Sequence, residues 1–97
     1  MNFHVYILYS FSRNLFYVGS TKNIHQRIYN HNHSLKGFTF PGKPWQLIWS
    51  TLKSSRQEAE ILEKKLKNIS RLKKISFMRK YPEGIHNNET LHEIIEI

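Results

Sequence analysis

Two short runs of β-branched and aromatic residues near the N-terminus constrain the fold more than any other feature. They are HVYILY, at residues 4–9, and LFYVG, at residues 15–19, and the polar segment SFSRN separates them. Two such runs with a short polar connection are typical of a β-hairpin, here with a loop of about four residues. We therefore expect the chain to begin with two antiparallel strands.

The alternation within the two runs predicts which side chains share a face of the hairpin. If Tyr6 pairs with Tyr17, both tyrosines lie on one face together with Leu8 and Leu15. The opposite face is then wholly apolar and consists of Val5, Ile7, Phe16 and Val18. A slip of one residue would mix the two sets, so the pattern favours a fixed register.

A polar, basic segment follows the hairpin and predicts a helix over residues 23–33. Ile24 and Ile28 lie four residues apart and mark its buried side. Arg27 and His31 have the same spacing, so they lie one above the other on a neighbouring stripe of the helix.

A loop and a third strand are expected next. The segment HSLKGFTFPGKP contains two Gly and two Pro, which predicts a loop. The following segment, WQLIWSTL, alternates between apolar and polar residues and predicts a strand. Trp45, Leu47 and Trp49 are expected to share one face of it.

The second half of the chain is predicted to be helical. Residues 54–70 carry the clearest pattern, because Ser55 and Glu58 have the spacing of a capping box. A core-facing stripe follows at intervals of three and four residues, namely Ala59, Leu62, Leu66 and Ile69. A short helix is expected after Ser70, with three anchors, Leu72, Ile75 and Met78.

The length of 97 residues suits one compact domain, because a second core would be hard to build from so short a chain. We predict this domain to span residues 1–82. Residues 83–97 are expected to form an acidic C-terminal tail, with weak helical spacing at Leu91, Ile94 and Ile95 and a tendency to fray.

The distribution of charge points to a polyanionic partner. All 15 Lys and Arg lie between Arg13 and Lys80, and residues 1–82 contain only three Glu and no Asp, a net charge of +12. Residues 83–97 contain four Glu and no Lys or Arg, a net charge of −4. So basic a body attracts polyanions, and nucleic acid is the leading candidate.

The remaining composition favours a cytoplasmic protein without membrane association. The absence of cysteine excludes disulfides and thiolate metal sites. No apolar run approaches the roughly 18 residues that a membrane-spanning helix needs. The N-terminus MNFHVYILYS also lacks the basic start and the cleavage site of a secretory signal.

Among the three Glu of residues 1–82, Glu63 is the best placed for chemistry. Glu58 is used in the predicted helix cap, and Glu60 points away from the apolar stripe toward solvent. Glu63 instead lies beside the stripe, at the boundary of the core. A purely structural role is equally open, because Lys67 lies four residues later and would form a helical salt bridge with it.

Several of these features, in their order along the chain, resemble the GIY-YIG nuclease superfamily. They are VYI in the first run, YVG about eleven residues later, then Arg27, His31 and Glu63. The loop GFTFPGKPWQLIW and the helix EAEILEKKLKNISRLKK resemble its small single-domain bacterial branch, which is related to the N-terminal incision domain of the excision-repair nuclease. The resemblance covers roughly residues 3–80.

This sequence departs from the family pattern at three positions. His4 and Val5 replace the first Gly and Ile, and Val18 replaces the Ile of the second triplet. Both tyrosines and the β-branched character remain, so the departures affect strand packing more than chemistry. The resemblance implies an α+β fold in which a three-stranded antiparallel sheet is flanked by helices.

The resemblance also implies metal-dependent hydrolysis of phosphodiester bonds in DNA, with repair or processing as the expected setting. Glu63 would hold one divalent ion, Mg²⁺ or Mn²⁺, and Arg27 would stabilise the scissile phosphate. Tyr6 would help to activate the attacking water, and Tyr17 would orient water or phosphate. His31, which titrates near neutrality, is a candidate second proton acceptor.

The expected partner is DNA, with branched or single-stranded forms as candidates. The residues expected to contact it are Lys22, Arg27, Lys36, Lys43 and Lys67. An alternative is a non-catalytic nucleic-acid-binding module of the same fold, in which Trp45 and Trp49 stack on unpaired bases. A third possibility is a protein-interaction domain whose acidic tail docks on the basic body or recruits a partner.

Overall fold

A computed structural model describes residues 2–33 and 40–96 of the chain. Three strands form one antiparallel sheet, and they are β1 (Phe3–Ser10), β2 (Leu15–Thr21) and β3 (Trp45–Lys53). β1 is central, so the strand order is β2-β1-β3. The helices are α1 (Ile24–His33), α2 (Arg56–Lys67), α3 (Arg71–Lys80) and α4 (Asn88–Glu96), with 3₁₀ turns η1 (Phe40–Gly42) and η2 (Pro82–Gly84). The predicted α+β class is confirmed.

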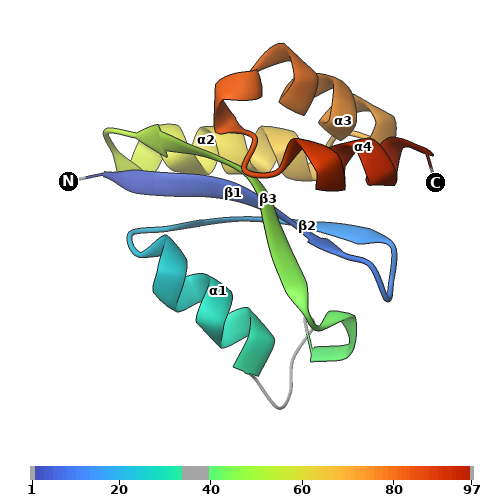
Figure 1. The fold of residues 1–97 in the computed structure, drawn as a ribbon. Coiled ribbons are helices and arrows are strands. Elements are labelled where there is room, and N and C mark those ends of the chain that lie inside the picture. The colour runs from blue at the N-terminus through green and yellow to red at the C-terminus, as the bar shows by residue number, and fades with distance from the viewer. Residues whose placement is uncertain (1, 34–39, 97) are drawn as a thin grey trace.

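The helices cover the two faces of the sheet unequally. Figure 1 shows α1 alone on one face, whereas α2, α3 and α4 lie together on the other. No helix within the described ranges is long and apolar enough to cross a membrane.

The hairpin forms as expected, but its register differs by two residues from the predicted one. Leu8 lies opposite Tyr17 and Tyr6 lies opposite Gly19, so the predicted pairing of Tyr6 with Tyr17 is wrong. β1 continues to Ser10, so the four-residue loop begins one position later in the chain than it would with the predicted pairing. Because side chains alternate with a period of two, this shift leaves every residue on its predicted face.

The register of β3 against β1 changes at Ile48, where a β-bulge inserts one extra residue. Trp45 and Leu47 therefore pack on the α1 face, while Trp49 packs in the core on the other face. The prediction that Trp45, Leu47 and Trp49 share one face is wrong. Trp45 and Trp49 are only 3% and 2% exposed, so this pair is not available to stack on unpaired bases.

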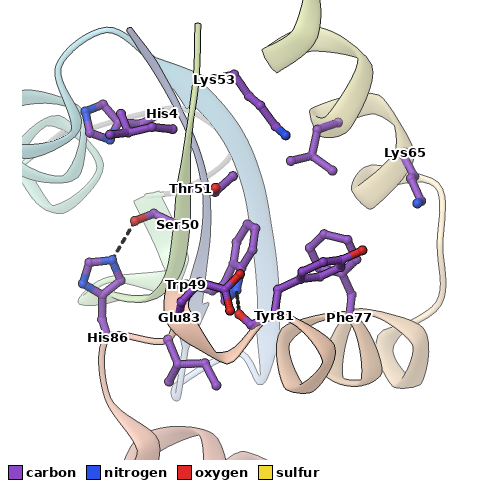
Figure 2. Close-up of a pocket in the computed structure, with 14 residues that line it drawn as sticks. His4, Trp49, Ser50, Thr51, Lys53, Lys65, Phe77, Tyr81, Glu83 and His86 are labelled. Carbon is purple, nitrogen blue, oxygen red and sulfur yellow. Dashed lines mark hydrogen bonds between the residues drawn. The ribbon is translucent and has the colours of Figure 1, made fainter.

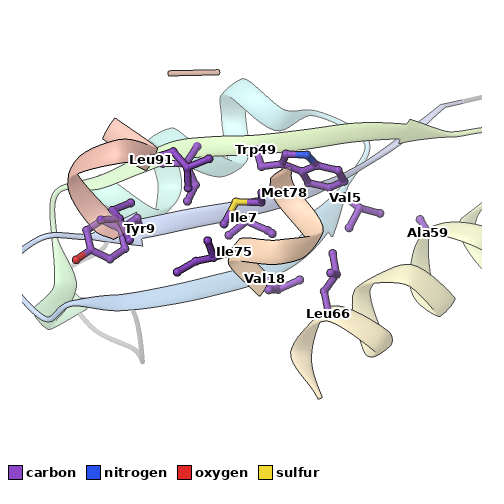
Figure 3. Close-up of a cluster of buried hydrophobic side chains, with 12 residues drawn as sticks. Val5, Ile7, Tyr9, Val18, Trp49, Ala59, Leu66, Ile75, Met78 and Leu91 are labelled. Carbon is purple, nitrogen blue, oxygen red and sulfur yellow. The ribbon is translucent and has the colours of Figure 1, made fainter. Parts of the chain in front are cut away.

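The main core lies between the sheet and the three helices. Figure 3 shows Val5 and Ile7 of β1 and Val18 of β2 facing side chains of α2 and α3. The helical partners shown include Leu66, Ile75 and Met78. These contacts confirm the predicted stripe on α2 and two of the three predicted anchors on α3.

Leu72, the third predicted anchor, is 75% exposed, so its predicted burial is wrong. The first turn of α3 presents Arg71 to the hairpin loop, where its guanidinium donates hydrogen bonds to the backbone and side-chain oxygens of Asn14. With Arg71 turned inward, the adjacent Leu72 points to solvent.

The C-terminal segment packs against the domain. Leu91 and Ile94 of α4 are 5% and 1% exposed and belong to the main core. Ile85 pairs with Trp49 in an isolated antiparallel bridge, and the backbone N–H of His86 donates to the carbonyl of Ile48. The division of the chain at residue 82 stays a prediction, but the segment after it shares the core of the body.

Candidate functional site

The five predicted site residues come from four elements and meet at the β2 edge of the sheet. Tyr6 and Tyr17 project from β1 and β2 toward α1, which contributes Arg27 and His31. Glu63 approaches from α2, on the other side of the sheet, and reaches Ser20 at the end of β2. The charge of Arg27 acts on Tyr6, His31 and Glu63, which places all of them in one electrostatic neighbourhood.

Tyr6 and His31 form a buried polar pair under α1. The Tyr6 Oη atom lies 3.2 Å from His31 Nε2, and Tyr6 is fully buried. The ring of Tyr17 meets that of His31 edge-on at 4.7 Å between centroids, and it stacks on Tyr6 at 6.5 Å. Packing of the three rings fixes the position of the Tyr6 hydroxyl.

The protonation states of this pair follow from burial. Burial raises the pKa of Tyr6 to about 12, even though the nearby Arg27 guanidinium lowers it, so the phenol is neutral at pH 7. Burial, together with the charge of Arg27, lowers the pKa of His31 below its ordinary value. His31 is therefore neutral near pH 7, and in the tautomer with its proton on Nδ1 it can accept a proton at Nε2.

Glu63 is held as a carboxylate by two partners. Its Oε2 lies 2.7 Å from the Lys67 ammonium, and its Oε1 accepts a hydrogen bond of 2.5 Å from the Ser20 hydroxyl. Burial raises the pKa of Glu63, but these two hydrogen bonds and the charges of Lys67 and Arg27 outweigh it and hold the pKa below its ordinary value. The salt bridge predicted for a structural role of Glu63 is thus present in the structure.

Sequence reasoning missed the roles of Ser20 and Gly19. Ser20 joins β2 to Glu63 across 43 positions of sequence, and its only local signal is that it directly follows YVG. Gly19 lies under the ring of Tyr6, where a Cβ atom would come within 2.4 Å of the Tyr6 hydroxyl oxygen. A side chain at this position would displace Tyr6. This steric conflict explains why the last residue of YVG is a glycine.

The residues of the site fit a single hard cation better than a metal cluster. The described parts of the chain contain no group of three or more His, Cys, Asp or Glu that could hold a metal ion. Glu63 offers an ionised oxygen ligand, but the Lys67 ammonium lies 2.7 Å from its Oε2 atom, so a bound ion would compete with Lys67 for this carboxylate. One carboxylate suffices for an ion such as Mg²⁺, which keeps most of its water ligands.

The residues predicted to contact DNA are distributed unevenly around this site. Lys22 and Arg27 line a groove of about 380 Å³ beside it. Lys67 is engaged by Glu63, and Lys43 lies between η1 and β3. Lys36 lies outside the described residues.

A cavity of about 730 Å³ lies at the opposite edge of the sheet, beside β3. Figure 2 shows that Ser50 and His86 point toward each other there, with 2.6 Å between Ser50 Oγ and His86 Nε2. In the same view the Trp49 indole N–H donates to the carbonyl of Tyr81. These contacts fasten the C-terminal segment to β3, and none of the five predicted site residues lines the cavity. We therefore locate the candidate site by its chemistry and not by cavity size.

Comparison with known proteins identifies the family of the chain. The profile of the GIY-YIG catalytic domain matches residues 2–76, so the chain belongs to the GIY-YIG family of nuclease-type domains. Among solved structures, it is similar to the UPF0213 protein BH0048 from Bacillus halodurans, with 28% sequence identity and a TM-score of 0.54. The match covers 81% of this chain and 84% of that one. Among curated proteins, no sequence matches significantly.

Proposed function

We propose that this protein is a metal-dependent endonuclease that hydrolyses phosphodiester bonds in DNA at the β2 edge of its sheet. The observation that carries the proposal is the convergence of an ionised Glu63, the guanidinium of Arg27 and the buried pair of Tyr6 and His31. A proton acceptor, a cation for the phosphate and a carboxylate for a metal ion are the groups that this reaction needs.

Glu63 and Arg27 divide the handling of charge between them. Glu63 would hold one Mg²⁺ or Mn²⁺, which, when bound, stabilises the negative charge that develops on the leaving oxygen. Arg27 is exposed on α1 and presents fixed N–H donors to the scissile phosphate, where they counter the charge that builds in the transition state.

Tyr6 and His31 would move the proton of the attacking water. With a pKa of about 12, Tyr6 is neutral at rest, and its hydroxyl lies 3.2 Å from His31 Nε2. As Tyr6 accepts the proton of water, its own hydroxyl proton passes to His31, so no isolated phenolate has to form in a buried position. Tyr17, which packs on both rings, would orient the water or the phosphate.

We further propose that the protein acts on branched or single-stranded DNA, in repair or processing, in the cytoplasm. The support is the resemblance to the incision domain of the excision-repair nuclease and the net charge of +12 on residues 1–82. Strict sequence specificity is not expected, because the sequence carries no recognisable base-reading element.

One observation favours a second candidate, a nucleic-acid-binding module without cleavage activity. The Lys67 ammonium lies 2.7 Å from the Glu63 carboxylate, an ion pair that gives this Glu a structural role of its own.

A cleavage assay separates the two candidates. Purified protein is incubated with plasmid, branched and single-stranded DNA in Mg²⁺, Mn²⁺ or EDTA. We expect products with a metal ion and none in EDTA, whereas DNA binding without products on any substrate would establish the second candidate.

A further inference from the structure

A groove beside the candidate site is lined by basic side chains, some of which have no part in the proposed catalysis. It has a volume of about 380 Å³ and lies between the end of β2, the start of α1 and the first turns of α2. Two of its lining residues, Ser20 and Arg27, also belong to the site described above. The groove is therefore continuous with the place proposed for the scissile phosphate.

An aromatic ring holds two of the cations that line this groove. The Lys22 ammonium and the centre of the Arg56 guanidinium each lie 5.6 Å from the centroid of the Phe3 ring. Lys22 follows β2 and Arg56 begins α2, so Phe3 of β1 gathers cations from two separate elements. Cation–π contacts limit the motion of both side chains and so prepare them to bind an anion together.

The charge balance of the groove suits a phosphate. Lys22, Arg27 and Arg56 provide three positive charges among its lining residues, and Glu60 provides one negative charge. Arg56 also begins the 12-residue helix α2, so the positive end of that helix dipole adds to the field. The net charge of these four side chains is +2, so two singly charged phosphodiester groups, the scissile one and a neighbour, would neutralise it.

We propose that Lys22 and Arg56, positioned by Phe3, bind the DNA phosphate next to the scissile phosphate held by Arg27. This inference rests on the proposed function, because it takes DNA as the ligand. It assigns to Arg56 a direct phosphate contact and to Phe3 a positioning role. The strand would run from Arg27 along the groove toward the first turn of α2.

The test measures binding of a short branched DNA with duplex arms in EDTA, so that it does not depend on cleavage. Each phosphate neutralised on duplex DNA adds about 0.9 to the slope of log affinity against log salt. We expect the double variant Lys22→Gln with Arg56→Gln to lose about 0.9 from the wild-type slope and about 10-fold or more in affinity at low salt. Phe3→Leu keeps both charges, so it should weaken binding roughly 2- to 5-fold with the slope unchanged.

Lys65→Gln is the matched control. Lys65 is also exposed and also lies over an aromatic ring, 5.8 Å from the centroid of Phe77, but it lines the cavity at the opposite edge of the sheet. We expect it to keep the wild-type slope. Lys65→Gln removes one charge and the double variant removes two, so a loss of slope in Lys65→Gln of half that in the double variant or more would overturn the inference, since it would reveal only a diffuse effect of net charge.

Two other outcomes would also overturn it. One is a wild-type slope and affinity in the double variant. The other is a site for small anions only, in which inorganic phosphate shifts the NMR signals of Lys22 and Arg56 but the branched DNA does not. The proposed function is tested separately by cleavage with Mg²⁺ or Mn²⁺, so a protein that cleaves DNA while the double variant binds normally would lose this inference and keep the function.

Discussion

The two faces of the sheet differ in what they bury. The face under α2, α3 and α4 holds a core cluster of twelve buried residues, all of them apolar or aromatic. Among the residues that the structure describes, the face under α1 holds a cluster of four such residues, and the polar His31 is buried beside it. β1 supplies both clusters by alternation, with Val5 and Ile7 on the first face and Tyr6 and Leu8 on the second. One strand thus serves stability with one set of side chains and the candidate site with the other.

The largest expected effect is on stability, from a change under α2. Leu66 is fully buried in the large cluster, so Leu66→Ala leaves a cavity and should lower the free energy of unfolding by about 2–5 kcal/mol. Urea unfolding followed by circular dichroism measures this loss. Under native conditions the folded fraction should still cleave DNA at close to the wild-type rate. A loss below 1 kcal/mol would contradict the claim that the face under α2, α3 and α4 supplies the stability.

Arg27→Ala tests the α1 face, where we expect a large loss of activity with little loss of stability. Arg27 is exposed, so its removal should change the free energy of unfolding by less than about 0.5 kcal/mol. Loss of a donor to the transition-state phosphate should reduce the cleavage rate about 10²- to 10³-fold and should also weaken DNA binding. Arg27→Lys, which keeps the charge but not the planar fork, should recover binding more than cleavage. A stability loss as large as that of Leu66→Ala would contradict the proposed separation.

A smaller, pH-dependent effect compares His31 with His86. Burial lowers the pKa of both, and the charge of Arg27 adds to the effect on His31. Between each lowered pKa and the ordinary value of 6.5, the unfolded chain binds more protons than the folded one. The free energy of unfolding should therefore be highest above pH 6.5 and should fall as the pH drops through this window.

Single substitutions separate the two contributions. His31→Gln and His86→Gln should each remove part of this slope in urea unfolding measured from pH 5 to 8. His31→Gln should also alter the pH dependence of cleavage, because His31 lies beside Tyr6 and His86 does not. An altered cleavage profile in His86→Gln, with none in His31→Gln, would reverse the assignment.

The sequence predicts those parts of the fold that local patterns determine. The hairpin, α1 and the buried stripe of α2 follow from alternation, helical spacing and a capping serine. The hairpin register does not, because a shift of two residues keeps every side chain on its face and so leaves the hydrophobic pattern unchanged. The sequence also does not predict the bulge at Ile48, because the bulge depends on how β3 twists against β1.

The candidate site shows the same limit. The order of residues along the chain predicts five site residues, namely Tyr6, Tyr17, Arg27, His31 and Glu63. The contact of Ser20 with Glu63 joins positions far apart in sequence, and the grouping of Lys22 and Arg56 around Phe3 joins three separate elements. No local pattern encodes such contacts, because tertiary packing alone brings the residues together.

The central claim is that Glu63 makes the β2 edge an active site, and Glu63→Gln tests it most directly. The amide is nearly isosteric, and the ion pair with Lys67 that it removes is worth only about 0.3–0.5 kcal/mol, so the fold should persist. Glu58→Gln, in the first turn of α2 and outside the lining of the phosphate groove, is the control. Cleavage is measured for the three proteins at equal saturation with DNA, over a range of Mg²⁺ and Mn²⁺ concentrations. The account predicts wild-type cleavage in Glu58→Gln, and in Glu63→Gln no cleavage at any metal concentration with DNA binding equal or stronger. Equal cleavage rates in Glu63→Gln and the wild type would contradict it.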